Sequence, residues 1–126
     1  MQLANLSHQI IEEMAYEIKR FLLDHEAWFD VSIYFNGKRL STRIGLDAYN
    51  HPEISLLEEN INPKDYFANT GHILCMSFEG TLYHILHYGD TREDALIRNG
   101  LYQIFKNYGC YHTYGDPWNL ALYRKE

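Results

Sequence analysis

The chain has 126 residues, of which 46% are hydrophobic, and a formal net charge of −6 at pH 7. This length and composition suit one globular domain over residues 1–126, which can bury a core without a disulfide or a structural metal. The negative charge argues against a nucleic-acid-binding protein, which needs a basic surface to neutralise phosphates, and against docking on anionic lipid.

The N-terminus has no basic segment followed by an apolar run, so it does not resemble a signal peptide. No apolar stretch reaches the ~18–20 residues that a membrane-spanning helix needs. The two cysteines, Cys75 and Cys110, lack the CxxC spacing of zinc ribbons and thioredoxins. We therefore expect a cytoplasmic protein with free thiols.

The first predicted element is a helix over residues 7–25. Apolar residues recur there at three- and four-residue spacing, which is typical of a helix that buries one face. Ser7 is a suitable N-cap. The apolar positions are Ile10, Ile11, Met14, Ile18, Phe21 and Leu22.

A β-hairpin is predicted next, with strands over residues 28–35 and 38–44. The turn residues Asn36-Gly37 both tolerate positive φ, as a type I′ turn requires. A two-residue turn pairs Phe35 with Lys38 and Ile33 with Leu40, so that apolar side chains share one face.

Residues 45–71 are harder to interpret, because turn-forming residues are scattered through them. Residues 54–60 could form a short helix. The segment is long for an ordinary loop in a compact domain, so we expect it to contain a helix or to carry function.

A second hairpin is predicted over residues 72–78 and 81–88, around Glu79-Gly80. Its register would pair Cys75 with His84 on one face and His72 with His87 on the other. The alternative is a helix that starts near Leu82, which periodicity does not exclude.

The C-terminal part predicts a helix over residues 92–108 and a final hairpin over 110–114 and 118–124. Thr91 and Asp94 form a capping-box pattern at the start of the helix. Gly100 in the middle of this helix suggests close packing, because glycine there costs ~1 kcal/mol relative to alanine. The whole order predicts an α+β fold: an antiparallel sheet of about six strands, built from three hairpins, with two helices packed on one face.

Three groups of residues could carry chemistry. Cys75 beside His84 could form a cysteine nucleophile with its base, although a buried cysteine beside a core histidine is the more common arrangement. His72 and His87, with Asp90 as a third ligand, could hold a metal, although solvated histidines are more common. The third group surrounds the last turn and has the composition of an interface anchor, although tyrosines are also good strand formers. This third group comprises Tyr111, His112, Tyr114, Asp116 and Trp118.

The common catalytic and nucleotide-binding motifs are absent, including GxGxxG, HExxH and GxSxG. The sequence therefore favours a small acidic protein-binding or inhibitor-type protein without catalytic activity or cofactor, for example an anti-defence protein of a mobile element. We expect its partner to be a protein with a basic surface. The alternatives are a small enzyme that uses the Cys/His pair or a histidine metal site, and a small-ligand carrier. Two copies could also pair as a homodimer through edge strands.

Overall fold

The computed structural model describes residues 6–42, 55–62 and 72–125. The described elements, in chain order, are α1 (His8–Asp24), β1 (Val31–Phe35), β2 (Lys38–Thr42), β3 (Ser55–Glu58), β4 (Leu74–Phe78), α3 (Thr81–Tyr88), α4 (Arg92–Asn107), β5 (Cys110–Tyr114) and β6 (Asn119–Arg124).

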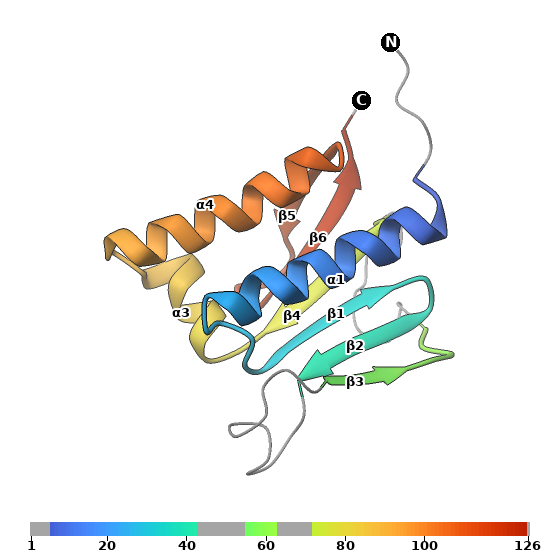
Figure 1. The fold of residues 1–126 in the computed structure, drawn as a ribbon, viewed down its shortest axis with the longest axis horizontal. Helices are drawn as coiled ribbons and strands as arrows, with labels where there is room; N and C mark the ends of the chain where they lie inside the picture. Colours follow the sequence, from blue (N-terminus) through green and yellow to red (C-terminus); the bar gives the residue numbers. More distant parts are fainter. Residues whose placement is uncertain (1–5, 43–54, 63–71, 126) are drawn as a thin grey trace.

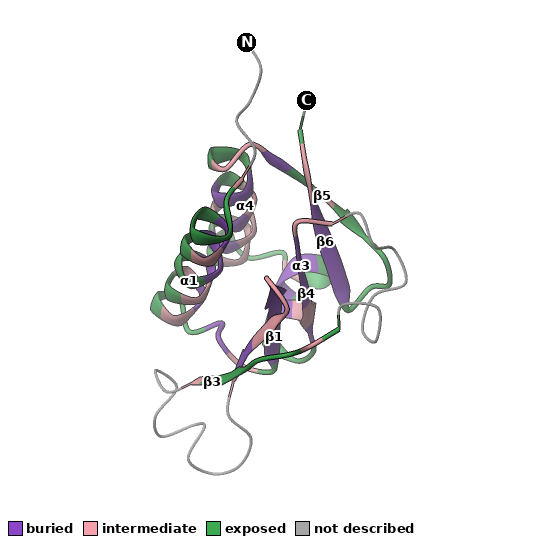
Figure 2. Ribbon diagram, turned by 90° about the vertical axis from the view of Figure 1, so that its right-hand side faces the viewer, coloured by how far each residue is buried: buried purple, intermediate pink, exposed green. Residues whose placement is uncertain are grey.

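The strands form one antiparallel sheet of six strands, in the order β3-β2-β1-β4-β6-β5 (Figure 1). Helices α1 and α4 lie side by side on one face of this sheet (Figure 2). The shorter α3 packs against α4. The expected α+β class, with a six-stranded antiparallel sheet and two helices on one face, is confirmed.

Helix α1 forms as predicted. The Ser7 hydroxyl accepts a hydrogen bond from the Ile10 amide at 3.1 Å and so caps the first turn. The face of α1 that points toward the sheet is buried and comprises Ile11, Met14, Ala15, Ile18 and Leu22.

The first hairpin also forms in the predicted register. Ile33 pairs with Leu40 and Phe35 with Lys38. Asn36 and Gly37 have φ values of 51° and 72°, as a type I′ turn requires. Strand β1 begins at Val31 rather than at residue 28, because Asp30, with φ of 56°, interrupts the extended chain.

The predicted second hairpin is wrong. Strand β4 forms, but residues 81–88 fold into helix α3. Both sides of β4 are already paired, with β1 and with β6, so no sheet position next to it remains for another strand. The helix instead buries Leu82, Ile85 and Leu86, whose three- and four-residue spacing suits a helix.

The short helix expected over residues 54–60 is also wrong. Residues Ser55–Glu58 form strand β3, which pairs with β2 in a register that places Leu57 opposite Leu40. This strand, rather than a third hairpin, completes the six-stranded sheet. Residues 43–54, which include the end of the predicted strand over 38–44, and residues 63–71 lie outside the described part of the chain.

The C-terminal elements agree with the prediction. Thr91 and Asp94 form a capping box at the start of α4, and β5 pairs with β6. Gly109, with φ of 72°, lets the chain leave α4 and enter β5.

The main core lies between the helices and the sheet (Figure 2). Its largest fully buried side chains include Trp28, Phe78 and Phe105. A smaller cluster of Tyr34, Cys75 and Ala121 lies on the opposite face of the sheet, where Ile61 and Tyr123 pack against it. None of the described helices is both long enough and apolar enough to cross a lipid bilayer.

Gly100 marks a close contact between α4 and α1, as the sequence suggests. A Cβ atom at this position would lie only 2.5 Å from Cζ of Phe21. The Phe21 ring in turn packs against His25, with 4.5 Å between ring centroids. The ring must therefore shift to admit any side chain at residue 100.

We predict that Gly100→Ala lowers the free energy of unfolding, although alanine is favoured over glycine in a helix by about 1 kcal/mol. In a Phe21→Ala background the same substitution should raise it, by up to about 1 kcal/mol, because the obstructing ring is gone. Urea unfolding of the four proteins measures this cycle. If Gly100→Ala has the same sign in both backgrounds, the packing role assigned to Gly100 is wrong.

Candidate functional site

Cys75 and His84 are not neighbours in the way that the predicted hairpin required. Cys75 lies in the middle of β4, on the face away from the helices, and is 1% exposed. His84 lies on α3 and is exposed to solvent. Burial raises the pKa of the Cys75 thiol to about 12, so the thiol stays protonated at neutral pH.

His72 and His87 are likewise not paired across a hairpin. His72 precedes β4 and lines a recess near the first hairpin. His87 lies on α3, where its Nε2 is 2.5 Å from the carbonyl oxygen of Pro117. Asp90 follows α3. Among the described residues, no group of three or more His, Cys, Asp or Glu side chains is placed to hold a metal ion.

An aromatic–histidine cluster forms where α3, α4 and β5 meet. We use this name for Tyr83, His87, Tyr102, His112 and Tyr114. The Tyr102 and His112 rings are stacked with 4.2 Å between centroids. The hydroxyl groups of Tyr102 and Tyr114 are hydrogen-bonded at 2.8 Å. The cluster therefore links α4 to the edge strand β5.

Helix α3 extends this cluster toward the surface. The His87 ring lies 5.0 Å from Tyr114 and 5.2 Å from Tyr83. Tyr88, at the end of α3, packs against Tyr83 and is 64% exposed. The sequence interpretation missed the α3 contribution because it treated residues 81–88 as a strand. The four-residue spacing of Tyr83 and His87 was the available signal.

The structure brings together some of the five predicted interface residues and separates others. His112 and Tyr114 belong to the aromatic–histidine cluster. Asp116 lies in the turn before β6, where its amide donates to the Asn119 side chain at 2.8 Å. Trp118 follows in the same turn and is 48% exposed. Tyr111 lies on the opposite face of the sheet and stacks on Tyr123.

The electrostatic environment keeps His112 and Tyr114 neutral. Burial, together with the nearby Lys106 cation, lowers the pKa of His112. Burial and the hydrogen bond with Tyr102 raise the pKa of Tyr114. His112 and Tyr114 therefore contribute aromatic rings and hydrogen-bonding groups rather than ionised ones.

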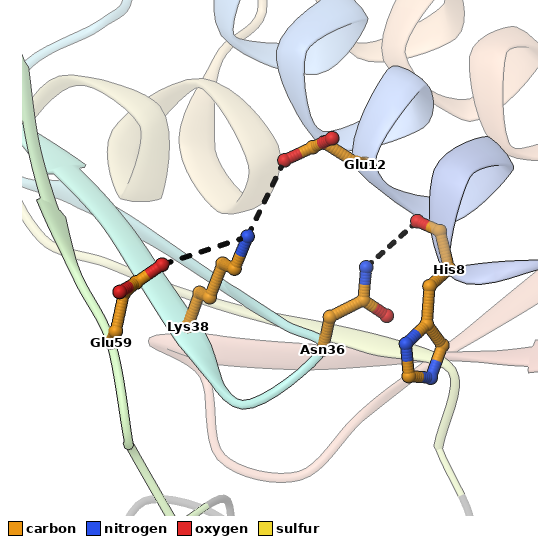
Figure 3. A network of polar contacts seen from close by, with 5 residues as sticks. All are labelled: His8, Glu12, Asn36, Lys38 and Glu59. Atoms are coloured by element: carbon orange, nitrogen blue, oxygen red, sulfur yellow. Dashed lines mark hydrogen bonds and ion pairs between the residues drawn. The ribbon is translucent and has the colours of Figure 1, made fainter.

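A separate recess of about 360 Å³ lies beside the tip of the first hairpin. Its wall combines apolar side chains, such as Ile11 and Ile73, with the imidazoles of His8 and His72. Figure 3 shows that Asn36 at the hairpin tip donates to the main-chain carbonyl of His8 at 2.8 Å. This bond joins the hairpin to the start of α1.

Lys38 adds charge near this recess, but its charge is balanced. Its Nζ lies 3.6 Å from Glu12 and 3.9 Å from Glu59 (Figure 3). These exposed ion pairs contribute little to stability. They do place two carboxylates around one ammonium, which makes the recess a poor site for an anion.

No family model matches this sequence, and no curated protein or solved structure is significantly similar to it.

We predict that neither Cys75 nor Cys110 reacts with iodoacetamide in the folded protein, because both thiols are buried and burial raises both pKa values. Both should react once urea unfolds the chain, and peptide mass spectrometry distinguishes the two sites. Rapid labelling of Cys75 under native conditions would instead reveal an accessible thiolate and revive the cysteine-enzyme hypothesis.

We predict that His112 makes the fold less stable in mild acid. Because its pKa is lowered in the folded protein, the unfolded chain takes up a proton first as the pH falls below about 6.5. The free energy of unfolding should therefore decrease between neutral pH and about pH 5, and less steeply in His112→Gln. Urea unfolding across this range measures both slopes. Equal slopes in the two proteins would contradict the role of His112.

Proposed function

We propose that the protein binds another protein through its α3–β5 surface, which comprises His87, Tyr88, Tyr114, Asp116 and Trp118. The observation that carries this proposal is the exposure of three large aromatic side chains, one on α3, one on β5 and one in the turn before β6. Tyr88 is 64% exposed, Trp118 48% and Tyr114 36%. Aromatic side chains in such numbers are enriched at interfaces and depleted from ordinary solvent-exposed surface.

Two rings of this surface and the main chain of Trp118 are held in place before any partner binds. Tyr114 is fixed by its hydrogen bond to Tyr102, and His87 by its contact with the Pro117 carbonyl. Trp118 is adjacent to Pro117, and its own carbonyl accepts a hydrogen bond from the Phe78 amide at 2.8 Å. Preorganised aromatic anchors lose little conformational entropy on binding, which favours affinity.

The charge of the chain supports a partner with a basic surface. The formal net charge is −6, and Asp116 stands among the aromatic residues of the surface. Lysine and arginine side chains bind over tyrosine and tryptophan faces through cation–π interactions. A negative protein also attracts a positive one over distance, which raises the association rate.

The other features support a binding role in the cytoplasm rather than catalysis. The cysteine proposed as nucleophile is buried and has a raised pKa, and the histidine proposed as its base lies on a different element. Both cysteines are free thiols, as in proteins of reducing compartments.

A second candidate function is transport or sensing of a small molecule in the recess beside the first hairpin. A volume of about 360 Å³ with mixed apolar and imidazole walls falls within the range of ligand sites. The balanced charge around Lys38 favours a neutral, partly apolar ligand over an anion.

We predict that replacing both Tyr88 and Trp118 by alanine weakens partner binding by more than about 100-fold, because truncating an aromatic hot spot costs ≥ ~2 kcal/mol. The melting temperature should change little, since both side chains are largely exposed. The partner is identified by affinity capture from cells of the host, and its affinity is then measured with purified proteins. Tyr16→Ala, which removes a partly exposed ring from α1, is the matched control.

Two results would overturn the proposal. If the double variant binds the partner as tightly as the unmodified protein, the interface lies elsewhere. Alternatively, native mass spectrometry of the protein from its host could show a bound small molecule that Ile73→Trp excludes and Tyr88→Ala/Trp118→Ala retains. That second outcome would favour the carrier function instead.

A further inference from the structure

The two terminal strands of the sheet, β5 and β3, present backbone groups that no other described strand pairs with. Just before β5 and just after β6, the Lys125 amide donates to the Gly109 carbonyl at 2.8 Å, which fixes which residue pairs of the two strands are hydrogen-bonded to each other. Because antiparallel ladders alternate, Cys110, His112 and Tyr114 direct their N–H and C=O groups away from β6. This edge can therefore accept another strand.

The β3 edge has the same property. The two-residue turn before β2 makes its flanking residues, Phe35 and Lys38, a hydrogen-bonded pair. Because the pairs alternate along each strand, this turn also determines which residues of β2 bond to β3. Counting from that turn, Leu56 and Glu58 bond to β2, whereas Ser55 and Leu57 direct their backbone groups outward. The Leu57 side chain points to the helix side of the sheet, since it pairs with Leu40 of the core.

The two edges differ in charge. Strand β5 itself contains no charged residue and no proline, two of the usual devices that protect an edge. Lys106 and Arg124 lie together at its Cys110 end, around one open recess. The β3 edge carries Glu58, which lies 3.5 Å from Arg39, and its neighbour Glu59, which shares Lys38 with Glu12; the glutamate side chains are 47% and 67% exposed.

The β3 edge also exposes apolar surface. Leu56 and Leu57 are 44% and 43% exposed, on opposite faces of the strand. An edge strand that exposes apolar side chains is a template for pairing with another strand. One edge is therefore acidic and aliphatic, and the other is basic and aromatic.

We propose that strand β3 of a second copy adds antiparallel to β5, with Leu57 opposite His112. This register places outward-directed backbone groups against each other on both strands. Leu57 of the second copy then meets the helix-side rings of His112 and Tyr102. Glu59 comes opposite Cys110, next to Lys106 and Arg124. The association does not depend on the protein-binding function proposed for the α3–β5 surface.

Charge favours this arrangement over a two-fold pairing of β5 with β5. Helix α4 packs on β5, with Arg98 near Tyr114 and Lys106 near His112. A two-fold axis through His112 would place Cys110 opposite Tyr114 of the second copy, and so bring Arg98 of each copy toward Lys106 of the other. Like charges so placed oppose association, whereas the β3 edge brings glutamates.

The contact is heterologous, because it joins two different edges. Each copy still offers one free edge after binding, so assembly continues head to tail rather than closing into a dimer. Only four residues of β3 take part, so each contact is weak. Oligomer size should therefore rise with protein concentration.

The test uses two variants that each block one edge. Leu57→Pro and His112→Pro remove an outward N–H and leave the hydrogen bonds of the strand to its own sheet. Sedimentation velocity over a wide concentration range should show growing oligomers for the unmodified protein and monomers for each variant alone. An equimolar mixture of the two variants should form a one-to-one complex and stop there.

Other outcomes overturn the proposal. If the unmodified protein stays monomeric at all concentrations, the edges do not pair. If Leu57→Pro still dimerises and His112→Pro does not, the two copies pair through β5 alone. A mixture that contains only monomers would show that β3 and β5 do not recognise each other.

Charge exchange provides a second test that does not depend on the proline variants folding. Glu59→Lys and Lys106→Glu should each weaken association by about tenfold, because each replaces an attraction by a repulsion of similar size. Mixing these two variants restores opposite charges at both contacts and should restore association. If each variant alone associates as the unmodified protein does, or if mixing does not restore association, the proposed register is wrong.

Discussion

The antiparallel pairing of β4 with both β1 and β6 is the constraint on which the rest of the structure depends. β4 joins the β3-β2-β1 half of the sheet to the β6-β5 hairpin. Leu74, Met76 and Phe78 point toward the helices and are almost fully buried. A slip by one residue would place Cys75 and Ser77 in the core instead, because the side-chain period of a strand is two. The register of β4 therefore decides which residues the whole sheet presents to α1 and α4.

The central place of β4 also explains the aromatic–histidine cluster. With both neighbours of β4 occupied, residues 81–88 could not join the sheet next to it and folded as α3. A helix leads directly into α4 and carries Tyr83 and His87 to β5. The candidate binding surface is thus a consequence of strand order, and its α3 half exists only because this segment is helical.

The two edge strands of the sheet differ in the charge around them. α4 and the end of β6 bring cations to β5, whereas the other edge carries Glu58 of β3 and the adjacent Glu59. The chain therefore has a locally basic edge although its net charge is −6. Its net charge alone does not determine which partners each edge attracts. What binds at each edge depends on the charges within about one Debye length of it.

Local patterns predicted much of the fold. Both long helices were predicted from their capping residues, Ser7 and Thr91, and from their apolar spacing. The first hairpin was predicted from the Asn36-Gly37 turn. Each of these signals depends on contacts between residues that are near in sequence. The close packing at Gly100 was likewise indicated by its cost in a helix. His112, Tyr114 and Trp118 are interface candidates from composition alone, and that role stays a prediction.

The errors concern segments whose local signals were ambiguous. Residues 81–88 are apolar at both strand and helix spacing, and Glu79-Gly80 resembles a hairpin turn, yet Gly80 serves as the N-cap of α3. Residues 55–58 have no alternation of apolar and polar side chains, so only pairing with β2 shows that they form a strand. The sequence by itself determined the α+β class, both long helices and the β1–β2 and β5–β6 hairpins, since those depend on local hydrogen bonds and side-chain periodicity. Strand order, the conversion of 81–88 to a helix and the separation of Cys75 from His84 were decided only in the tertiary structure, because they depend on which distant strands compete for the two sides of β4.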